Sequence, residues 1–307
     1  MRNFIIDTDT ASDDAVAIVM ALRQPDIDVK AITVVAGNVP LPQAVQNALY
    51  TVELCGADTP VYAGCAKPLL RDLETAQDVH GRDGMGDIGL PLQGRAPANG
   101  HAADALREVI NAHAGDITLV TLGPLTNVAL ALLREPELAR CVSHCWIMGG
   151  IGSGHGNVTP TAEFNIWVDP EAAKIVYESG MNMTMVGWDI SWKHATFDAE
   201  QAAVIRRIGT PLAEFVIDIQ ATLTEFSMTE NALPGFDLPD PITMAAAIDP
   251  SIAEYRDYRV DVTTGAGLER GITVVDVLGV TKRAPQMRVA TSADRAAFVN
   301  MLKRSFS

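Results

Sequence analysis

Short apolar runs alternate with segments of helical periodicity over the first two thirds of the chain. The continuous apolar or β-branched runs, which predict buried strands, are residues 4–6, 29–36, 117–121, 142–148 and 183–186. Between several of these runs, apolar residues recur at the spacing of one helix face, as over 15–22, 43–55 and 125–133. Continuous apolar strands separated by helices are typical of a parallel sheet that is covered on both faces.

The last third of the chain has a different pattern. Helices are predicted over 199–208, 212–229 and 293–303, and the proline-rich segment 231–241 predicts an irregular loop. Residues 258–262, 272–275 and 286–290 alternate as in an antiparallel hairpin region. We therefore expect an α/β fold with a largely parallel central sheet flanked by helices and a small antiparallel portion late in the chain. No repeat or clear linker interrupts residues 1–307, so a single domain is expected.

Polar residues gather at the carboxyl ends of the predicted strands. The runs end in Asp7-Thr8-Asp9, Gly37-Asn38, Gly123, Gly149-Gly150 and Asp189. Because open α/β sheets bind ligands in the crevice beyond the carboxyl ends of their strands, we expect a site there. Loops are polar in general, which explains the glycines but accounts less well for the acids. The connection 71–99 is long and rich in Gly, Asp and Pro, as functional or mobile loops usually are.

Composition and charge remove several classes of protein. The 307 residues are 48% hydrophobic and carry a net charge of −15, with no contiguous basic segment, which argues against a general nucleic-acid binder. Four cysteines are too few for a disulfide framework at this length and fit a reducing compartment. Cys141, His144 and Cys145 lack a second ligand pair, which favours ordinary thiols over a metal site. No signal peptide or membrane span is apparent, so a soluble cytoplasmic protein is expected.

The sharpest local feature is an acidic turn between the first strand and the first helix. Four carboxylates fall within eight residues, at Asp7, Asp9, Asp13 and Asp14. Helix capping accounts for Ser12 and Asp13, but it does not account for Asp7 and Asp9 as well. Like charges packed so closely must either be solvated or surround a cation, and oxygen ligands favour Ca²⁺ or Mg²⁺ over Zn²⁺. A metal site is the preferred interpretation.

Two enzyme classes place such a turn after their first strand. A haloacid-dehalogenase-like phosphatase, which uses Mg²⁺, also begins with an apolar run followed by Asp-x-Asp-x-Thr. Here the residue in the threonine position is Ala11, and the acids continue at Asp13 and Asp14. This continuation, and the lack of a clear lysine motif before a late acidic pair, are foreign to the phosphatase pattern.

The run Asp7-Thr8-Asp9-x-x-x-Asp13-Asp14 resembles instead the opening signature of the inosine-uridine-preferring nucleoside hydrolases. Further matches follow in the order of that family. They are Val35-Ala36-Gly37-Asn38-Val39, His80-Gly81-x-Asp83-Gly84, Leu122-Gly123-Pro124-Leu125-Thr126-Asn127, Met148-Gly149-Gly150, Ala162-Glu163-Phe164-Asn165, Asp169-Pro170-Glu171-Ala172 and Asp240-Pro241. Each piece is weak alone, but the ordered set covers the chain to about residue 245 and is specific.

The resemblance implies an enzyme of nucleoside catabolism and purine or pyrimidine salvage. Members of the family hydrolyse the N-glycosidic bond of ribonucleosides, purine or pyrimidine, to ribose and free base with a bound Ca²⁺. By resemblance, Asp9, Asp14 and Asp240 ligate Ca²⁺ through side chains, and Leu122 does so through its backbone carbonyl. Asp9 also orients a water molecule and accepts its proton. Hard oxygen donors suit Ca²⁺, and metal charge lowers the pKa of a bound water.

The resemblance also implies which residues bind the substrate. The matching positions are Asp13, Asn38, Met148, Asn157, Glu163, Phe164 and Asn165. Amides and carboxylates supply the donors and acceptors that three ribose hydroxyls require. Carboxylates also stabilise the positive charge that develops on the sugar in an oxocarbenium-like transition state. Family members commonly form homodimers or homotetramers, and the same is expected here.

One departure from the family concerns the leaving group. Many members carry His immediately before the last metal-binding Asp, but here that residue is Pro239, which has no proton to give. His80 is the leading replacement as a catalytic group, because imidazole titrates near neutrality, although it could equally order its loop. Trp188, Trp192 or Phe226 could stack on a base or belong to the core.

Three hypotheses follow from the sequence. The first is a Ca²⁺-dependent ribonucleoside hydrolase with open base preference. The second is a relative that keeps the sugar site but has altered its substrate or lost its leaving-group acid. The third is a Mg²⁺-dependent phosphatase, which has no need of Glu163, Asn165 and Asp240.

Overall fold

A central sheet of eight strands organises the chain, and the computed structural model describes all residues from 1 to 307. The strand order is β3-β2-β1-β4-β5-β6-β12-β9, and every neighbouring pair is parallel except β12 and β9 at one edge. The strands are β1 (Arg2–Thr8), β2 (Ile27–Val34), β3 (Val61–Ala63), β4 (Ile117–Thr121), β5 (His144–Met148), β6 (Met183–Val186), β9 (Ala253–Tyr258) and β12 (Met287–Ala293). The predicted α/β class is confirmed.

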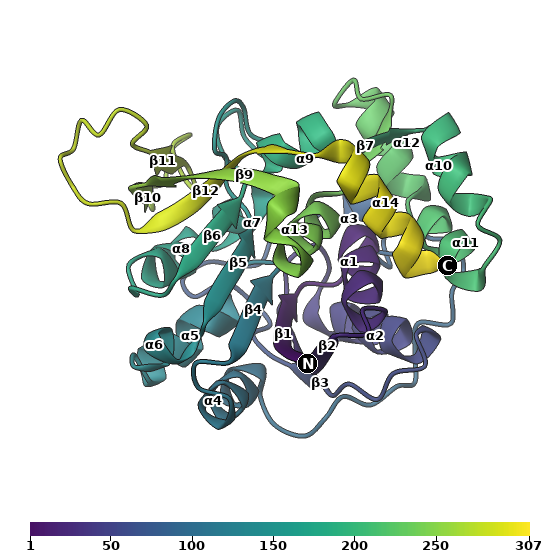
Figure 1. The fold of residues 1–307 in the computed structure, drawn as a ribbon, viewed down its shortest axis with the longest axis horizontal. Helices are drawn as coiled ribbons and strands as arrows, with labels where there is room; N and C mark the ends of the chain where they lie inside the picture. The colour runs from purple at the N-terminus through teal and green to yellow at the C-terminus, as the bar shows by residue number, and fades with distance from the viewer.

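Helices cover both faces of this sheet (Figure 1). They are α1 (Ser12–Leu22), α2 (Leu41–Leu54), α3 (Gln77–His80), α4 (Ala102–Ala112), α5 (Thr126–Arg134), α6 (Leu138–Cys141), α7 (Phe164–Val168), α8 (Pro170–Tyr177), α9 (Trp188–His194), α10 (Ala199–Arg206), α11 (Pro211–Asp218), α12 (Ala221–Thr229), α13 (Pro239–Ile248) and α14 (Arg295–Phe306). None of them combines the length and the apolar character that crossing a membrane requires.

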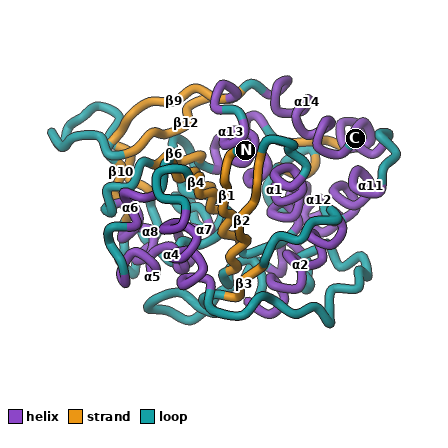
Figure 2. Tube along the Cα trace, turned by 60° about the horizontal axis from the view of Figure 1, so that its bottom comes forward, coloured by secondary structure: helices purple, strands orange, loops and turns teal.

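Two hydrophobic clusters lie on opposite faces of the sheet. Side chains alternate along a strand, so Phe4 and Ile6 of β1 join one cluster while Ile5 joins the other. The first cluster includes α1, α2, α13 and α14, and the second includes α4, α5 and α8. Figure 2 shows the sheet between these two groups of helices. Burial of the strands on both faces explains why their sequences are continuously apolar.

The late antiparallel portion is confirmed, but its boundaries differ from the prediction. The run 258–262 is divided between β9 and β10 (Val260–Val262), and β10 pairs antiparallel with β11 (Thr273–Val275). The run 286–290 becomes β12, which joins the main sheet parallel to β6 and antiparallel to β9. Alternation along a strand does not reveal its partner, so the sequence alone could not separate these pairings.

Two other predictions in the last third were wrong. The single helix predicted over 212–229 is broken into α11 and α12 at Ile219 and Gln220. The Gln220 amide is buried and donates hydrogen bonds to the carbonyls of Ser12 (3.1 Å) and Val216 (3.2 Å), so the chain turns to hold the start of α1. The predicted loop 231–241 contains β8 (Gly235–Asp237), which pairs with β7 (Thr196–Asp198), and the start of α13. Pro239 occupies the first turn of that helix, where proline is tolerated.

Candidate active site

The order of the strands reverses at β1, which places a topological switch point between β1 and β4. Ligand sites of open α/β sheets form at such points, beyond the carboxyl ends of the strands. A cavity of about 380 Å³ opens there. The predicted site residues that line it are Asp13, Asn38, His80, Leu122, Met148, Asn157, Glu163, Phe164, Asn165 and Asp240. Asp9 and Asp14 are fully buried and lie behind this lining.

The acidic turn leads from β1 into the first turn of α1. Asp14 accepts hydrogen bonds from the Thr8 hydroxyl (2.5 Å) and from the Ala11 N–H (2.9 Å), so it caps the helix at its third residue. The Asn47 amide donates to the Thr10 carbonyl at 2.9 Å and holds the turn against α2. The carboxylate of Asp14 therefore caps the helix. The carboxylates of Asp9 and Asp13 are not needed for this cap.

Carboxylate oxygens of Asp13, Asp14 and Asp240 all lie within 4.8 Å of one another. Asp13 and Asp14 come from the start of α1, and Asp240 comes from the first turn of α13. Burial, together with repulsion from neighbouring carboxylates, raises the pKa of Asp13 and of Asp240 well above the usual range. Like charges in a buried site are costly unless a cation or protons compensate them.

This carboxylate cluster fits a hard metal ion. All its ligand atoms are oxygens, and Asp13 Oδ1 is buried without a hydrogen-bond partner. An unpaired buried acceptor is unusual in a native protein and marks a position that a cation can fill. The cluster could therefore hold a divalent ion, as the sequence predicted for this region.

Asp9 lies beside this cluster, between the strand ends on either side of β1. One carboxylate oxygen accepts the Asn38 N–H at 2.6 Å, and the other is buried with no partner. A Cβ added to Gly37 would lie 2.1 Å from the first oxygen, and one added to Gly123 would lie 2.5 Å from the second. Burial and repulsion from Asp14 raise the pKa of Asp9 well above its usual range.

The loop after β4 meets the start of α7 across the cavity. The Asn165 amide donates to the Leu122 carbonyl at 2.7 Å and lies 3.2 Å from the Met148 sulfur. Leu122, Met148 and Asn165 are thus brought together from β4, β5 and α7, as the motifs predicted. A carbonyl has two lone pairs, so the contact with Asn165 leaves Leu122 able to accept a second partner.

Glu163 is the N-cap of α7 and faces the same cavity. Its carboxylate accepts N–H groups from Gly150 (2.8 Å), Asn165 (2.9 Å) and Ile166 (3.3 Å). Burial raises the pKa of Glu163 to about 7, against these hydrogen bonds. Asn157 accepts the Phe164 N–H at 3.0 Å, which fixes the loop that carries it.

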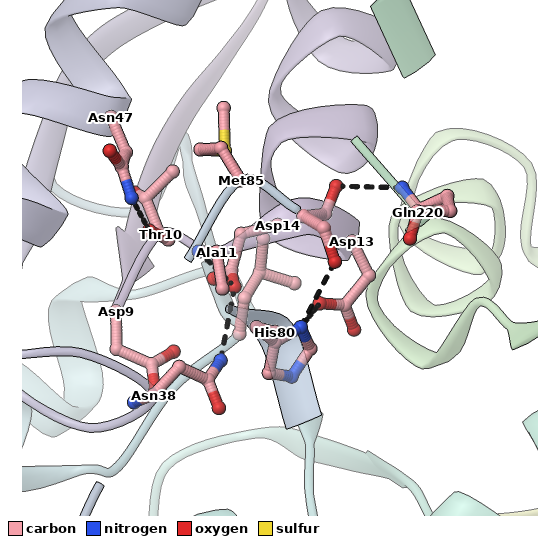
Figure 3. A network of polar contacts seen from close by, with 12 residues as sticks. Asp9, Thr10, Ala11, Asp13, Asp14, Asn38, Asn47, His80, Met85 and Gln220 are labelled. Atoms are coloured by element: carbon pink, nitrogen blue, oxygen red, sulfur yellow. Dashed lines mark hydrogen bonds and ion pairs between the residues drawn. The ribbon is translucent and has the colours of Figure 1, made fainter. Parts of the chain in front are cut away.

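His80 ends the short helix α3 and faces the carboxylate cluster, as Figure 3 shows. Its Nδ1 lies 3.0 Å from the Ser12 hydroxyl and 3.8 Å from Asp13 Oδ1. Burial lowers the pKa of His80 to about 4, so the ring is neutral at pH 7. A neutral ring that accepts the Ser12 hydroxyl at Nδ1 carries its proton on Nε2.

Aromatic and apolar side chains form the rest of the wall. Trp188 and Phe226 line the cavity, and Trp192 packs edge-on against Trp188 at 4.9 Å between ring centroids. Of the three aromatic residues considered from the sequence, two therefore reach the cavity and one supports it.

Comparison with known proteins agrees with this geometry. The sequence profile of the family described as inosine-uridine preferring nucleoside hydrolase matches residues 4–300. The chain belongs to this family. It is therefore an N-glycosyl hydrolase, and the phosphatase hypothesis is wrong.

Individual relatives match over nearly the whole chain. The pyrimidine-specific ribonucleoside hydrolase RihA of Escherichia coli O7:K1 is 39% identical over 300 residues, covering 97% of this chain and 96% of that protein. A solved plant nucleoside hydrolase, PpNRh1, has a TM-score of 0.94 at 34% identity, with 100% and 99% of the two chains covered. The purine-preferring ribonucleoside hydrolase from Gardnerella vaginalis has a TM-score of 0.92 at 31% identity, with 99% and 98% covered.

Several residues in the nucleoside hydrolase motifs support the site from behind. Asn127 donates to Asp7 Oδ1 at 2.9 Å and accepts the Cys65 N–H at 2.8 Å, which ties three strand ends together. Asp169 accepts the Thr126 hydroxyl at 2.7 Å and the Leu69 N–H at 2.9 Å. Neither Asn127 nor Asp169 lines the cavity, so these motif residues hold the loops that carry the site.

Sequence reasoning missed two buried polar residues of the cavity wall. Asp237, at the end of β8, and Ser227, on α12, both line the cavity and are buried. The Ser227 hydroxyl has no hydrogen-bond partner. Asp237 stands three residues before Asp240, and an acid so close to a motif was a signal that could have been followed. Ser227 sits in an ordinary helical pattern and gave no signal.

Proposed function

We propose that this enzyme catalyses the Ca²⁺-dependent hydrolysis of the N-glycosidic bond of purine and/or pyrimidine ribonucleosides, giving ribose and free base. The observation that carries the proposal is the buried, oxygen-only carboxylate cluster at the floor of a cavity lined by amides and acids. Relatives named for pyrimidine-specific and for purine-preferring activity both support a ribonucleoside and leave the base open.

The residues that would hold Ca²⁺ are Asp9, Asp14, Asp240 and the Leu122 carbonyl, with Asp13 beside them. When bound, Ca²⁺ supplies positive charge that attracts the ribose hydroxyls and acidifies a water molecule. Burial, and then repulsion from neighbouring carboxylates, raises the pKa values of Asp9 and Asp240, and a cation would relieve the repulsion.

Asp9 is the proposed general base. Its buried oxygen without a partner is the atom that would accept the proton from the attacking water, while the Asn38 N–H holds the other oxygen at 2.6 Å. Because the Asn38 N–H holds one oxygen, and because Gly37 and Gly123 leave no space for a side chain beside either oxygen, the carboxylate is oriented before the substrate arrives.

The proposed ribose site consists of Asp13, Asn38, Met148, Asn157, Glu163, Phe164 and Asn165. Their carboxylate and amide oxygens face a sugar that becomes positively charged as the glycosidic bond breaks. Groups fixed by backbone hydrogen bonds, such as Glu163, need no reorganisation to stabilise that charge.

His80 is proposed to contact the leaving base. Its Nδ1 is engaged with Ser12, and the residue lines the cavity, so the Nε2 hydrogen is the one that would point to the base. A neutral imidazole donates a hydrogen bond to the base but does not supply the extra proton that an imidazolium would.

A substrate panel tests the proposal. Inosine, uridine and a nitrophenyl riboside are incubated with the enzyme, with Ca²⁺ and with a chelator, and release of reducing sugar is followed. We expect hydrolysis that the chelator abolishes and Ca²⁺ restores. In the Asp9→Asn variant, kcat should fall at least about 100-fold with an unchanged circular dichroism spectrum. Turnover that survives within a few-fold would remove Asp9 from the role of base.

Pro239 favours one second candidate, a relative with an altered substrate. An activated leaving group needs no acid, so cleavage of the nitrophenyl riboside without cleavage of inosine or uridine would identify such an enzyme. In either case, loss of the nitrophenyl riboside reaction on addition of the chelator would support a metal-dependent sugar site.

We also propose a cytoplasmic homodimer or homotetramer. Large apolar side chains stand exposed on the arm formed by β10, β11 and the loop after them, among them Leu268 (78% exposed), Leu278 (85%) and Val280 (71%). Figure 1 shows this arm projecting from the sheet. Exposed apolar clusters mark association surfaces, and light scattering of the purified protein gives the oligomeric state directly.

A further inference from the structure

The proposed mechanism needs a proton for the departing base, and neither Pro239 nor a neutral His80 provides one. We propose that Asp237, held by Ser191, donates this proton; the inference rests on the proposed function. Asp237 is the remaining buried acid in the cavity wall, since Asp13, Asp240 and Glu163 belong to the metal and ribose sites. Glu74 and Asp78 also line the cavity but are exposed.

The backbone fixes Asp237 rigidly at the edge of the cavity. It is the last residue of β8, paired with Thr196 of β7, and Leu238 after it is the N-cap of α13. The same helix carries Pro239 and Asp240. Asp237 is therefore held in a constant position relative to the carboxylate cluster, as an acid that serves one bond of the substrate must be.

The Ser191 hydroxyl lies between two acceptors, one of which is Asp237. The Ser191 oxygen lies 3.0 Å from the Trp188 carbonyl and 2.7 Å from Asp237 Oδ2. A hydroxyl has a single proton, while the carbonyl and an ionised carboxylate are both pure acceptors. The single proton can therefore reach only one of the two acceptors at a time, and it can turn to Asp237 whenever that carboxyl group is ionised.

Burial agrees with a protonated Asp237. Desolvation raises the pKa of Asp237, and hydrogen bonds from Ser191 and Trp188 only partly oppose that effect. A carboxyl group kept neutral in this way can give a proton to a leaving group.

The surroundings of Asp237 suit a base. Trp188 and Phe226 supply flat apolar surface in the same cavity, and Ser227 supplies a buried hydroxyl without a partner. The residues assigned to the metal and the ribose account for other positions of the same lining. We therefore place the nucleobase of a bound nucleoside against the group that contains Trp188, Phe226 and Asp237.

The step balances as follows. The bond between C1′ and the base nitrogen breaks, and its electron pair stays on the base. The Asp237 carboxyl proton passes to the base, which leaves neutral, while water adds to C1′ and gives a proton to Asp9. The single hydroxyl proton of Ser191 then turns from the Trp188 carbonyl to Asp237 and stabilises the new carboxylate. Asp9 returns its proton to solvent, and Asp237 takes one back.

The test compares an isosteric variant on two kinds of substrate. In Asp237→Asn, kcat/KM for inosine or uridine should fall about 100-fold or more, since a general acid contributes at least that factor. For the nitrophenyl riboside, whose leaving group needs no proton, kcat/KM should change less than about threefold. Equal losses on both substrates, or none on the nucleosides, would overturn the role of Asp237. Wild-type enzyme inactive on all substrates would instead overturn the proposed function.

Matched variants separate chemistry from charge and structure. Asp78→Asn removes a carboxylate from the same cavity without a hydrogen-bond network, and it should leave the ratio of the two kcat/KM values unchanged. Ser191→Ala should lower kcat/KM for nucleosides about tenfold and leave kcat/KM for the nitrophenyl riboside unchanged. Ser191→Thr, which keeps the hydroxyl, should have the wild-type kcat/KM for nucleosides. Failure of threonine to restore the nucleoside reaction would contradict the positioning role of Ser191.

Infrared spectroscopy tests the protonation of Asp237 without turnover. The difference spectrum between wild-type enzyme and Asp237→Asn, recorded at neutral pH with Ca²⁺, should contain the deuterium-sensitive carbonyl stretch of a protonated carboxyl group. A difference spectrum that contains only carboxylate bands for Asp237 would overturn the proposal.

Discussion

His80 illustrates how burial decides the chemistry of a single side chain. Removed from water and facing Ser12 and Asp13, its ring stays neutral at pH values where an exposed histidine begins to ionise. We predict that His80→Ala lowers kcat/KM for inosine or uridine about tenfold, the loss of roughly one hydrogen bond. The nitrophenyl riboside should lose less than about threefold in the same assay. Equal losses would leave His80 as a residue that orders its loop.

Glu163 gives the protein a pH-dependent stability with a defined sign. Its pKa is raised to about 7 in the folded state, above its ordinary value of 4.5, so the folded chain keeps this proton longer than the unfolded chain does. The contribution of this proton to the free energy of unfolding is fully present below about pH 4.5, and it is lost as pH rises through 7. We predict that, between pH 4.5 and 8, the free energy of unfolding of the wild-type enzyme falls by on the order of 3 kcal/mol more than that of Glu163→Gln.

Urea unfolding at both pH values, with Ca²⁺ held constant, measures this difference. The constant Ca²⁺ concentration keeps the carboxylate cluster in one state, so that the contrast reports Glu163. Parallel pH dependences in the two proteins would contradict a raised pKa for Glu163.

At the scale of elements, the segments that follow β2 and β4 enclose Asp9, which comes directly after β1. Gly37 and Gly123 come from those two ends and leave no room for a side chain against Asp9. We predict that Gly123→Ala lowers kcat at least about tenfold, because its methyl group would displace the Asp9 carboxylate. Gly209→Ala is the control, since Gly209 has a φ of +76° and nothing within 4 Å of the added Cβ. It should cost stability in a thermal melt while kcat stays unchanged.

The strands β1, β2, β4, β5 and β6 could be predicted because each contains a largely buried, continuously apolar run. The edge strands β3 and β9 lack such a run. The motif residues could be placed as well, since parallel strands bring their carboxyl ends to one edge. The break between α11 and α12 could not be foreseen, because it depends on Gln220 reaching the carbonyl of Ser12, 208 residues away. The hydrogen bond between Ser191 and Asp237 could not be foreseen for the same reason, since the two residues are 46 positions apart. Contacts between distant segments are absent from local patterns.

At the scale of the whole molecule, folding and cation binding are coupled. Both hydrophobic clusters pack on one sheet, and we propose that residues 1–307 unfold as a single domain. We predict one thermal transition, whose midpoint rises by roughly 5 °C at Ca²⁺ concentrations of about 100 times Kd, equivalent to about 2.7 kcal/mol. Calorimetry with Ca²⁺ and with a chelator measures the shift. Two separate transitions, or a midpoint insensitive to the chelator, would contradict this prediction.

The meeting of α1 and α13 at the carboxylate cluster has one more consequence. Each helix begins there, so each directs unpaired N–H groups and the positive end of its dipole toward the acids. This fixed positive potential reduces the electrostatic repulsion among the carboxylates of the cluster while no cation is bound. Under the proposed dependence on Ca²⁺, the folded chain can therefore persist in an inactive form, and the supply of the ion, rather than new synthesis, would decide how much of the enzyme is active.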